Sequence, residues 1–161
     1  MINKALFSAF LAAGFAGCAG AAIAQDRAPA LELRTQIGPS LDAPERLDSI
    51  AARKCTSLTD SGLGYSILKS GAGPSPGPAA RVRVAYAGYF LSDGAKFDTG
   101  DNSSFAVNGV IPGFQEGLQL MQRGAVYRLC VPSRLGYGAR GAGAAIPPDS
   151  HLIFLLMLRD F

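Results

Sequence analysis

The chain has 161 residues, 48% of them hydrophobic, and a formal net charge of +3. One domain is the natural expectation at this length, and the hydrophobic content is sufficient for a packed core, which excludes global disorder. The charge is small and the Lys and Arg residues are scattered, so we expect no nucleic-acid surface.

Residues 1–24 have the pattern of a secretory signal peptide. Their apolar stretch, residues 5–17, is too short to span a membrane, which takes about 20 residues. Small residues at Ala22 and Ala24 match the positions that a leader peptidase reads. We therefore expect cleavage after Ala24 and a periplasmic or secreted protein. In the alternative, Cys18 belongs to a lipoprotein box and is acylated, and only then does the protein contact the outer membrane.

Residues 25–61 are expected to form an N-terminal extension with a short helix. The helix is expected at residues 42–54, because Pro44 suits a first helical turn. Leu47 and Ile50 follow at helical spacing, so one face of this helix would be apolar.

Removal of the leader leaves two cysteines, Cys55 and Cys130. Two thiols in an oxidising compartment are a candidate disulfide. The alternative is a pair of unlinked, partly buried cysteines.

Residues 62–161 have the pattern of a small α+β domain. Strands are expected at 64–69, 81–91, 125–131 and 151–159, with short strand pieces at 96–98 and 105–107. Pro112 is suited to begin a helix that runs to about Met121, because the first helical position needs no N–H. These elements predict an antiparallel sheet with one short helix packed against it.

The last strand is apolar on both faces. One face, expected to meet the helix, carries Leu152, Phe154, Leu156 and Leu158. The other carries Ile153, Leu155 and Met157, and Cys130 points to the same side. Because an exposed apolar stripe favours a cover, we expect the helix at 42–54 to lie there, fastened by Cys55. A partner or a second copy is the alternative cover.

Few residues are suited to acid–base or metal chemistry. His151 is the one histidine, and no cluster of His, Cys or carboxylate residues has ligand spacing, so we expect no metal and no cofactor. A hydrolase would need a nucleophile beside a base, and His151 follows a turn with no acid nearby in sequence.

Three sequence phrases carry seven of the 14 aromatic residues: YAGYFLSDGAKFD at 86–98, VIPGFQEGLQLM at 110–121 and GYGARGAGAAIPPDSHLIFLL at 136–156. Their wording and order resemble the FKBP-type peptidyl-prolyl cis-trans isomerases, most closely the secreted bacterial, Mip-like members, over roughly residues 62–161. The resemblance implies a twisted antiparallel sheet wrapped around a short helix, isomerase activity and proline-containing polypeptides as partners.

The same resemblance implies the site residues. The catalytic set is Tyr86, Phe97, Asp98 and Tyr137. The substrate-binding set is Val110, Ile111, Phe114, Ile146 and Phe154.

Rotation about a peptide bond has a barrier of about 18–20 kcal/mol and breaks no covalent bond. A site poor in acids and bases can therefore catalyse it by binding the twisted amide more tightly than either planar form. Our hypothesis is that the Tyr137 hydroxyl and the Ile111 N–H position the substrate, while Asp98 acts through Tyr86 or the substrate. The alternatives are a chaperone that binds proline peptides without turnover and an envelope lipoprotein.

Two positions depart from the family pattern. Phe114 stands where most relatives have Trp, so we expect weaker binding of macrolide inhibitors. Ser103 stands near the position of a second Phe in many relatives, so we expect a more open pocket there.

Overall fold

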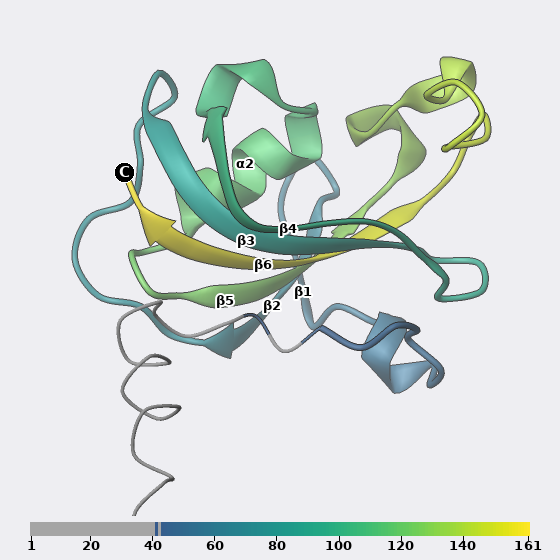
Figure 1. Ribbon diagram of the computed structural model, residues 1–161, viewed down its shortest axis with the longest axis horizontal. Coiled ribbons are helices and arrows are strands. Elements are labelled where there is room, and N and C mark those ends of the chain that lie inside the picture. Colours follow the sequence, from purple (N-terminus) through teal and green to yellow (C-terminus); the bar gives the residue numbers. More distant parts are fainter. Residues whose placement is uncertain (1–40, 42) are drawn as a thin grey trace, which may run out of the picture. The chain divides into compact units, whose positions relative to one another are not determined.

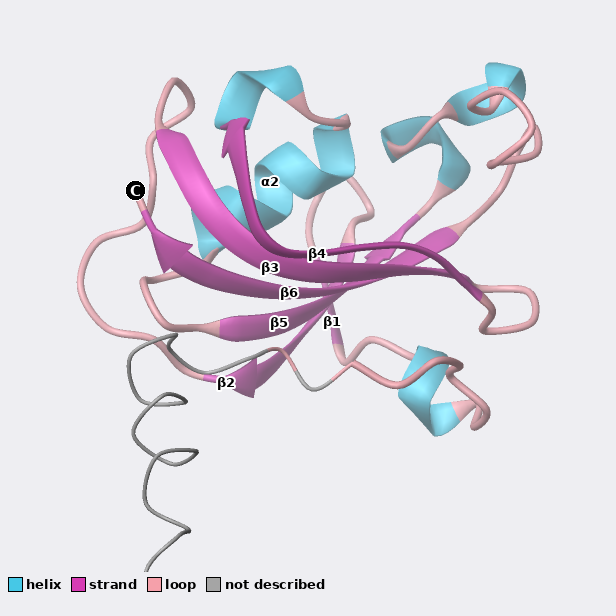
Figure 2. Ribbon diagram, viewed as in Figure 1, coloured by secondary structure: helices cyan, strands magenta, loops and turns pink. Residues whose placement is uncertain are grey.

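The computed structural model describes residue 41 and residues 43–161. Six strands form one antiparallel sheet in the order β1-β2-β5-β6-β3-β4 (Figures 1 and 2). The strands are β1 (Ser57–Leu58), β2 (Gly64–Lys69), β3 (Arg81–Phe90), β4 (Lys96–Ala106), β5 (Val126–Val131) and β6 (Leu152–Asp160). The one α-helix of the described residues, α2 (Pro112–Leu120), lies against one face. The predicted α+β fold, a twisted sheet around a short helix, is confirmed.

The signal peptide predicted at residues 1–24, with Cys18 and the expected cleavage position after Ala24, lies outside the described residues. Within the described part of the chain, no helix combines the length and the apolar character that crossing a membrane requires.

The main core lies between α2 and the sheet. Tyr127, Leu129 and Val131 of β5 alternate with less buried neighbours and all point into this core. Gly113 and Gly117 let α2 approach β5 closely, because a Cβ atom on either would overlap a side chain of that strand. The close approach directs the helix's apolar side chains onto β6 and β3.

Strand β4 is continuous, whereas the sequence predicted two short pieces. Its 11 residues pair along most of the length of β3, with register shifts that mark bulges. Because β4 is an edge strand with much of its length exposed, its polar middle section costs little to place there. The apolar alternation that identifies a half-buried strand is therefore missing.

The segment of residues 43–54, called the strap below, crosses the sheet face opposite α2 (Figure 1). The helix predicted at 42–54 is wrong, because the described residues there form only a 3-10 turn at Ala51–Arg53. The backbone N–H of Leu47 instead donates to the carbonyl oxygen of Gly94, in the β3–β4 turn, at 2.9 Å. This tertiary pairing overrides the local helical pattern.

The strap covers the apolar back of the sheet. A second core cluster consists of Leu47, Ala87, Tyr89, Ile153 and Leu155, with Leu41, Ala43 and Ala52 packed against it. The Tyr89 hydroxyl donates a 2.7 Å hydrogen bond to the carbonyl oxygen of Pro44. The cover expected for Ile153 and Leu155 is thus present as extended chain, and Met157 on the same face is also buried.

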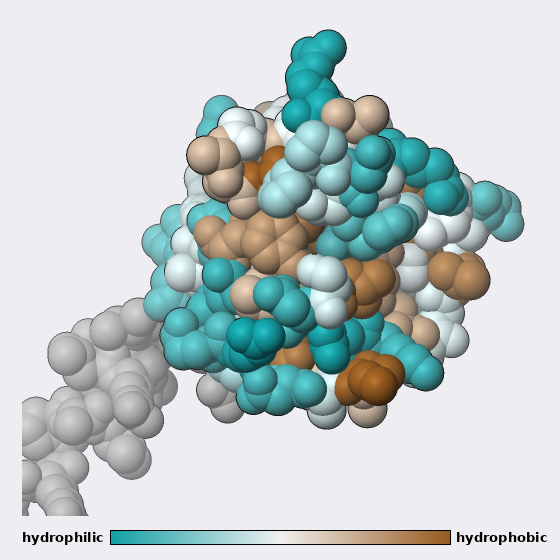
Figure 3. Space-filling view, turned by 90° about the vertical axis from the view of Figure 1, so that its right-hand side faces the viewer, coloured by the Kyte–Doolittle hydropathy of each residue, from teal (hydrophilic) through white to brown (hydrophobic). Residues whose placement is uncertain are grey.

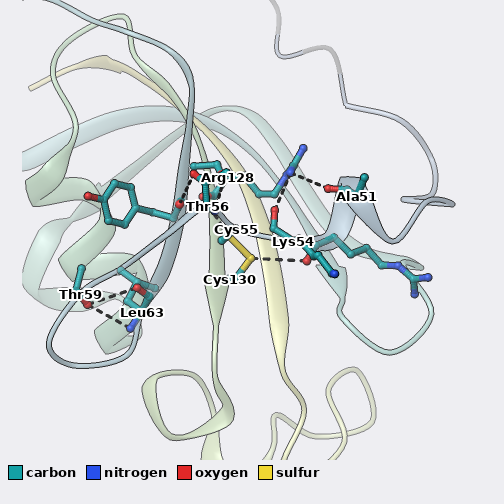
Figure 4. Close-up of a disulfide and its surroundings, with 11 residues drawn as sticks. Ala51, Lys54, Cys55, Thr56, Thr59, Leu63, Arg128 and Cys130 are labelled. Carbon is teal, nitrogen blue, oxygen red and sulfur yellow. Dashed lines mark hydrogen bonds between the residues drawn. A yellow bond between two sulfur atoms is a disulfide. The ribbon is translucent and has the colours of Figure 1, made fainter.

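A disulfide joins Cys55, at the end of the strap, to Cys130 on β5 (Figure 4). Next to it, the Arg128 guanidinium donates hydrogen bonds to the carbonyl oxygens of Ala51 and Lys54, at 3.2 and 2.8 Å. Two residues after Cys55, the chain joins the sheet as strand β1. The sheet therefore begins before residue 62, where we expected the domain to start.

Candidate active site

Five aromatic rings from four elements form one group, called the aromatic cluster below: Tyr86, Phe97, Phe105, Phe114 and Phe154. Phe114 of α2 is at its centre, with ring centroids 5.2 Å from Phe154, 6.1 Å from Tyr86 and 6.2 Å from Phe105. All three contacts are edge-to-face, the arrangement that the ring quadrupole favours. The ring of Phe97 meets Phe154 in the same way at 5.9 Å.

Gly88 of β3 makes room for two of these rings. A Cβ atom at this position would lie 2.7 Å from Phe97 and 2.9 Å from Phe154. Since Gly88 pairs with Phe154 on β6 and with Asp98 on β4, any side chain there would displace the cluster. The absence of a side chain at Gly88 therefore leaves space for the rings of Phe97 and Phe154.

One carboxylate lies at the edge of the cluster. The Tyr86 hydroxyl donates a 2.8 Å hydrogen bond to Oδ2 of Asp98, and Oδ1 accepts one from the Thr99 N–H at 2.8 Å. Burial, followed by the bond to Asp98, raises the pKa of Tyr86 from 10.0 to about 12. The phenol therefore remains a neutral donor at physiological pH, and its hydrogen bond connects Asp98 to the aromatic cluster.

Tyr137 lies after the 3-10 turn Ser133–Leu135 that follows β5, at the start of the glycine-rich loop. Its side chain is 39% exposed, and it is close enough to Tyr86 to add to the raised pKa of that phenol. Ile146, farther along the same loop, is buried in the main core, and its backbone pairs with Ala142. The loop is therefore anchored at Ile146, while Tyr137 stays accessible.

Val110 and Ile111 lead into α2 and are both partly buried against the main core. The Ile111 carbonyl accepts hydrogen bonds from the N–H groups of Phe114 and Gln115, each at 3.0 Å. Its own N–H donates to no other described residue. This donor at the start of α2 is thus available to a ligand.

Sequence reasoning missed two rings. Phe105 contacts Tyr86 at 5.8 Å and Phe114, and it lies two residues from Ser103, where we expected an opening. Phe90 extends the group, with its ring 5.0 Å from Phe97. Phe105 pairs with Val82 across β3 and β4. This pairing would have placed Phe105 at the site, but it depends on a continuous β4, which the sequence did not indicate.

Titratable chemistry is sparse around these rings. His151 is exposed, and it lies immediately before β6. In the part of the chain that the structure describes, no group of three or more His, Cys, Asp or Glu side chains is arranged to hold a metal ion. What the arrangement offers is a cluster of packed aromatic rings, a neutral phenol and a backbone N–H that donates to no other described residue.

Comparison with known proteins identifies the family of the chain. A family model described as FKBP-type peptidyl-prolyl cis-trans isomerase matches residues 73–159. The FKBP-type 22 kDa peptidyl-prolyl cis-trans isomerase of Escherichia coli K12 is 39% identical over 139 residues, which cover 84% of this chain and 67% of the relative. The outer membrane protein MIP of Legionella longbeachae is 42% identical over 102 residues, which cover 61% of this chain and 43% of that protein.

Solved structures give the same result. FkpA from Escherichia coli has a TM-score of 0.61 at 36% identity, over 65% of this chain and 50% of that one. A peptidyl-prolyl cis-trans isomerase from Pseudomonas syringae pv. tomato has a TM-score of 0.59 at 34% identity, over 73% of this chain and 81% of that one. The chain spans half or less of FkpA and MIP, so it shares one domain with these longer relatives. It belongs to the family of FKBP-type peptidyl-prolyl cis-trans isomerases.

Proposed function

We propose that this protein is exported and accelerates rotation of X-Pro bonds during the folding of other exported proteins. The observation that carries the proposal is the aromatic cluster, whose edge holds one carboxylate that already accepts the Tyr86 hydroxyl. Such a site binds an apolar ring and has no group arranged for acid–base attack. An uncatalysed X-Pro bond takes tens to hundreds of seconds to isomerise, so a catalyst of rotation alone is useful.

The proline ring enters between Phe97, Phe114 and Phe154, and the site excludes water from the amide. As the bond twists, resonance is lost and the carbonyl becomes less polar, so an apolar environment stabilises the twisted state relative to both planar states. No proton need be transferred, and activity should not require a group that titrates near neutral pH.

Polar groups orient the substrate at the rim. The free N–H of Ile111 donates a hydrogen bond to a substrate carbonyl, and the hydroxyl of the exposed Tyr137 makes a second hydrogen bond to the substrate backbone. Tyr86, held by Asp98, keeps its ring against Phe114 and Phe105. Val110 and Ile146 complete the apolar surroundings.

Export is supported by the leader and by the disulfide, which is stable in an oxidising compartment. We propose cleavage after Ala24 and a periplasmic or secreted mature chain. Mass spectrometry of the protein purified from its host tests this: a mature N-terminus at Gln25 supports it, and an acylated Cys18 would show the outer-membrane lipoprotein instead.

A protease-coupled assay on a short proline peptide tests catalysis. The mature chain should turn over the cis isomer, and the double variant Tyr137→Phe with Phe97→Ala should lose at least about tenfold in kcat/KM. Tyr65→Phe is the matched control, because Tyr65 stacks on Tyr127 outside the cluster. Binding of the peptide without turnover by the wild type would show a chaperone rather than an isomerase.

A further inference from the structure

Two grooves adjoin each other at the end of the sheet where β3 and β5 finish and β6 begins. The first, of about 590 Å³, lies between the 91–93 turn and residues 147–151, with Phe90 in its wall. The second, of about 620 Å³, extends from that turn to the disulfide and Leu58. Three residues line both grooves: Leu91, Ser92 and His151. Together they form one path, called the end groove below.

One end of this path begins beside the aromatic cluster. Phe90 lines the groove, and its ring lies 5.0 Å from that of Phe97. A polypeptide whose proline occupies the cluster therefore has a hollowed surface along which its flanking residues can continue.

The strand order gives the length of the path. From Phe90 on β3 to Leu58 on β1, it crosses β6, β5 and β2. Four strand spacings of about 4.8 Å make about 19 Å, which an extended chain covers in about six residues at about 3.3 Å each. The register agrees, because Leu58 pairs with Gly64, which in turn pairs with Cys130.

The far part of the end groove is apolar and exposed. Ile50 and Leu58, which line it, are 66% and 76% exposed, more than any other large hydrophobic residue of the described chain. Figure 3 views the molecule from this side and shows apolar patches between hydrophilic side chains. Large apolar side chains around a hollow are typical of a binding surface.

Charge divides the end groove into two parts. Asp93 and Asp149 line the part near the aromatic cluster, while Arg53 and Lys54 line the far part. The groove therefore complements a chain with basic residues close to its proline and with acidic and apolar residues farther away.

The strap keeps the groove in shape. Arg53 donates hydrogen bonds to the carbonyl oxygens of Leu91 and Ser92, at 3.3 and 2.9 Å. Leu47 holds the same turn through Gly94, and the disulfide forms part of the groove wall. A surface fixed in this way needs little ordering when a chain binds.

We propose that the end groove binds the client polypeptide itself, in extended form, and that the client reaches Leu58 about seven residues from the isomerised proline, because the 5.0 Å from Phe90 to Phe97 adds to the length of the path. Apolar client side chains pack on Ile50 and Leu58. The inference rests on the proposed function, because it requires the client's proline to occupy the aromatic cluster. It makes unfolded chains better substrates than short proline peptides.

The test compares two substrates on the double variant Ile50→Ser with Leu58→Ser. For an unfolded protein whose refolding is limited by X-Pro isomerisation, KM should rise at least about fivefold with kcat unchanged, because uniform binding is lost. A proline tetrapeptide ends before the far part of the groove, so its kcat/KM should stay at the wild-type value. Ile67→Ser is the matched control, since Ile67 is 53% exposed on β2 and does not line the groove.

Equal kinetics of wild type and double variant on the unfolded protein would overturn the proposal. So would a dimer, seen in sedimentation, that the double variant abolishes, because a second copy would then occupy the groove. If the wild type fails to turn over the tetrapeptide, the proposed function fails first. The groove is then judged by a photo-crosslinker placed about seven residues from the proline of a long peptide: attachment near Leu58 supports it, and attachment elsewhere overturns it.

Discussion

The hydroxyl of Tyr86 donates a 2.8 Å hydrogen bond to the carboxylate of Asp98, and this bond links β3 to β4 at the edge of the aromatic cluster. A second link, from the Thr99 hydroxyl to the Tyr86 carbonyl at 3.0 Å, lies beside it. The ring of Tyr86 is therefore fixed on both its polar end and its backbone. Its two aromatic neighbours, Phe105 and Phe114, depend on that position.

Tyr86→Phe should reduce kcat/KM on a proline tetrapeptide by about tenfold, which corresponds to the loss of a charge-assisted hydrogen bond of about 1.5 kcal/mol. The ring remains, so binding of apolar ligands should change less than turnover. Tyr65→Phe, on β2, removes a hydroxyl outside the cluster and should leave turnover unchanged. An unchanged rate for Tyr86→Phe would separate the phenol from catalysis.

Alkaline pH should destabilise the fold through Tyr86. Its pKa is raised from 10.0 to about 12 in the folded state, so the folded state holds the phenolic proton more tightly than the unfolded state. The associated stability is complete below pH 10 and is lost as the pH rises toward 12. Denaturant titrations across this range should show a smaller loss for Tyr86→Phe than for the wild type. Burial also raises the pKa of Tyr89 and of Tyr127, so part of the loss should persist in the variant.

Much of the fold could be predicted because its alternation is local. The buried positions of β5 follow from the alternation of apolar and polar residues. The start of α2 at Pro112 follows from the missing N–H of proline, which the first helical position does not need. The conformation of the strap could not be predicted, because it depends on the hydrogen bond from Leu47 to Gly94. Gly94 lies 47 residues after Leu47 in the sequence and comes next to it only when the chain folds. Gly94 has a φ of 74°, and a Cβ atom there would overlap the Leu47 carbonyl.

The site shows the same division. Tyr86, Phe97, Phe114 and Phe154 were expected from their resemblance to a known pattern, and the structure places their rings together. Phe105 was missed, because its role depends on the register of an edge strand whose polar sequence gives no periodic signal.

Removing the disulfide should lower the free energy of unfolding by about 2–4 kcal/mol, since the cross-link closes a long loop of the unfolded chain. The sequence separation of the two cysteines is 75 residues. The double variant Cys55→Ser with Cys130→Ser, measured by urea titration, should match the wild type in reductant. Mass mapping without reductant that finds two free thiols in the wild type would contradict the cross-link.

Leu47→Ala should destabilise the fold by about 2–4 kcal/mol, because Leu47 is 4% exposed and fills the second core cluster. Leu58→Ala makes the same chemical change at a side chain that is 76% exposed and should cost less than about 0.5 kcal/mol. Equal effects in thermal unfolding would mean that the strap does not hold the back of the sheet in solution.

Phe114→Trp should strengthen macrolide binding by at least about tenfold, because a larger ring adds apolar contact and an indole donor. The added volume in a packed site should also cost about 1–3 kcal/mol of stability. Phe161→Trp places the same residue beside Arg123, outside the aromatic cluster, and serves as the control in isothermal titration. No gain in affinity for Phe114→Trp would show that Phe105 already occupies the space.

Strand β6 lies between β5 and β3, although both of its neighbours precede it in the sequence. Until residues 152–160 are available, the sheet exists only as two separate parts, β1-β2-β5 and β3-β4, each with an unpaired inner edge. A chain held back by a ribosome or a translocation channel before this point has no continuous sheet on which the aromatic cluster can assemble. The continuous sheet can therefore form only after β6 has been added between β5 and β3.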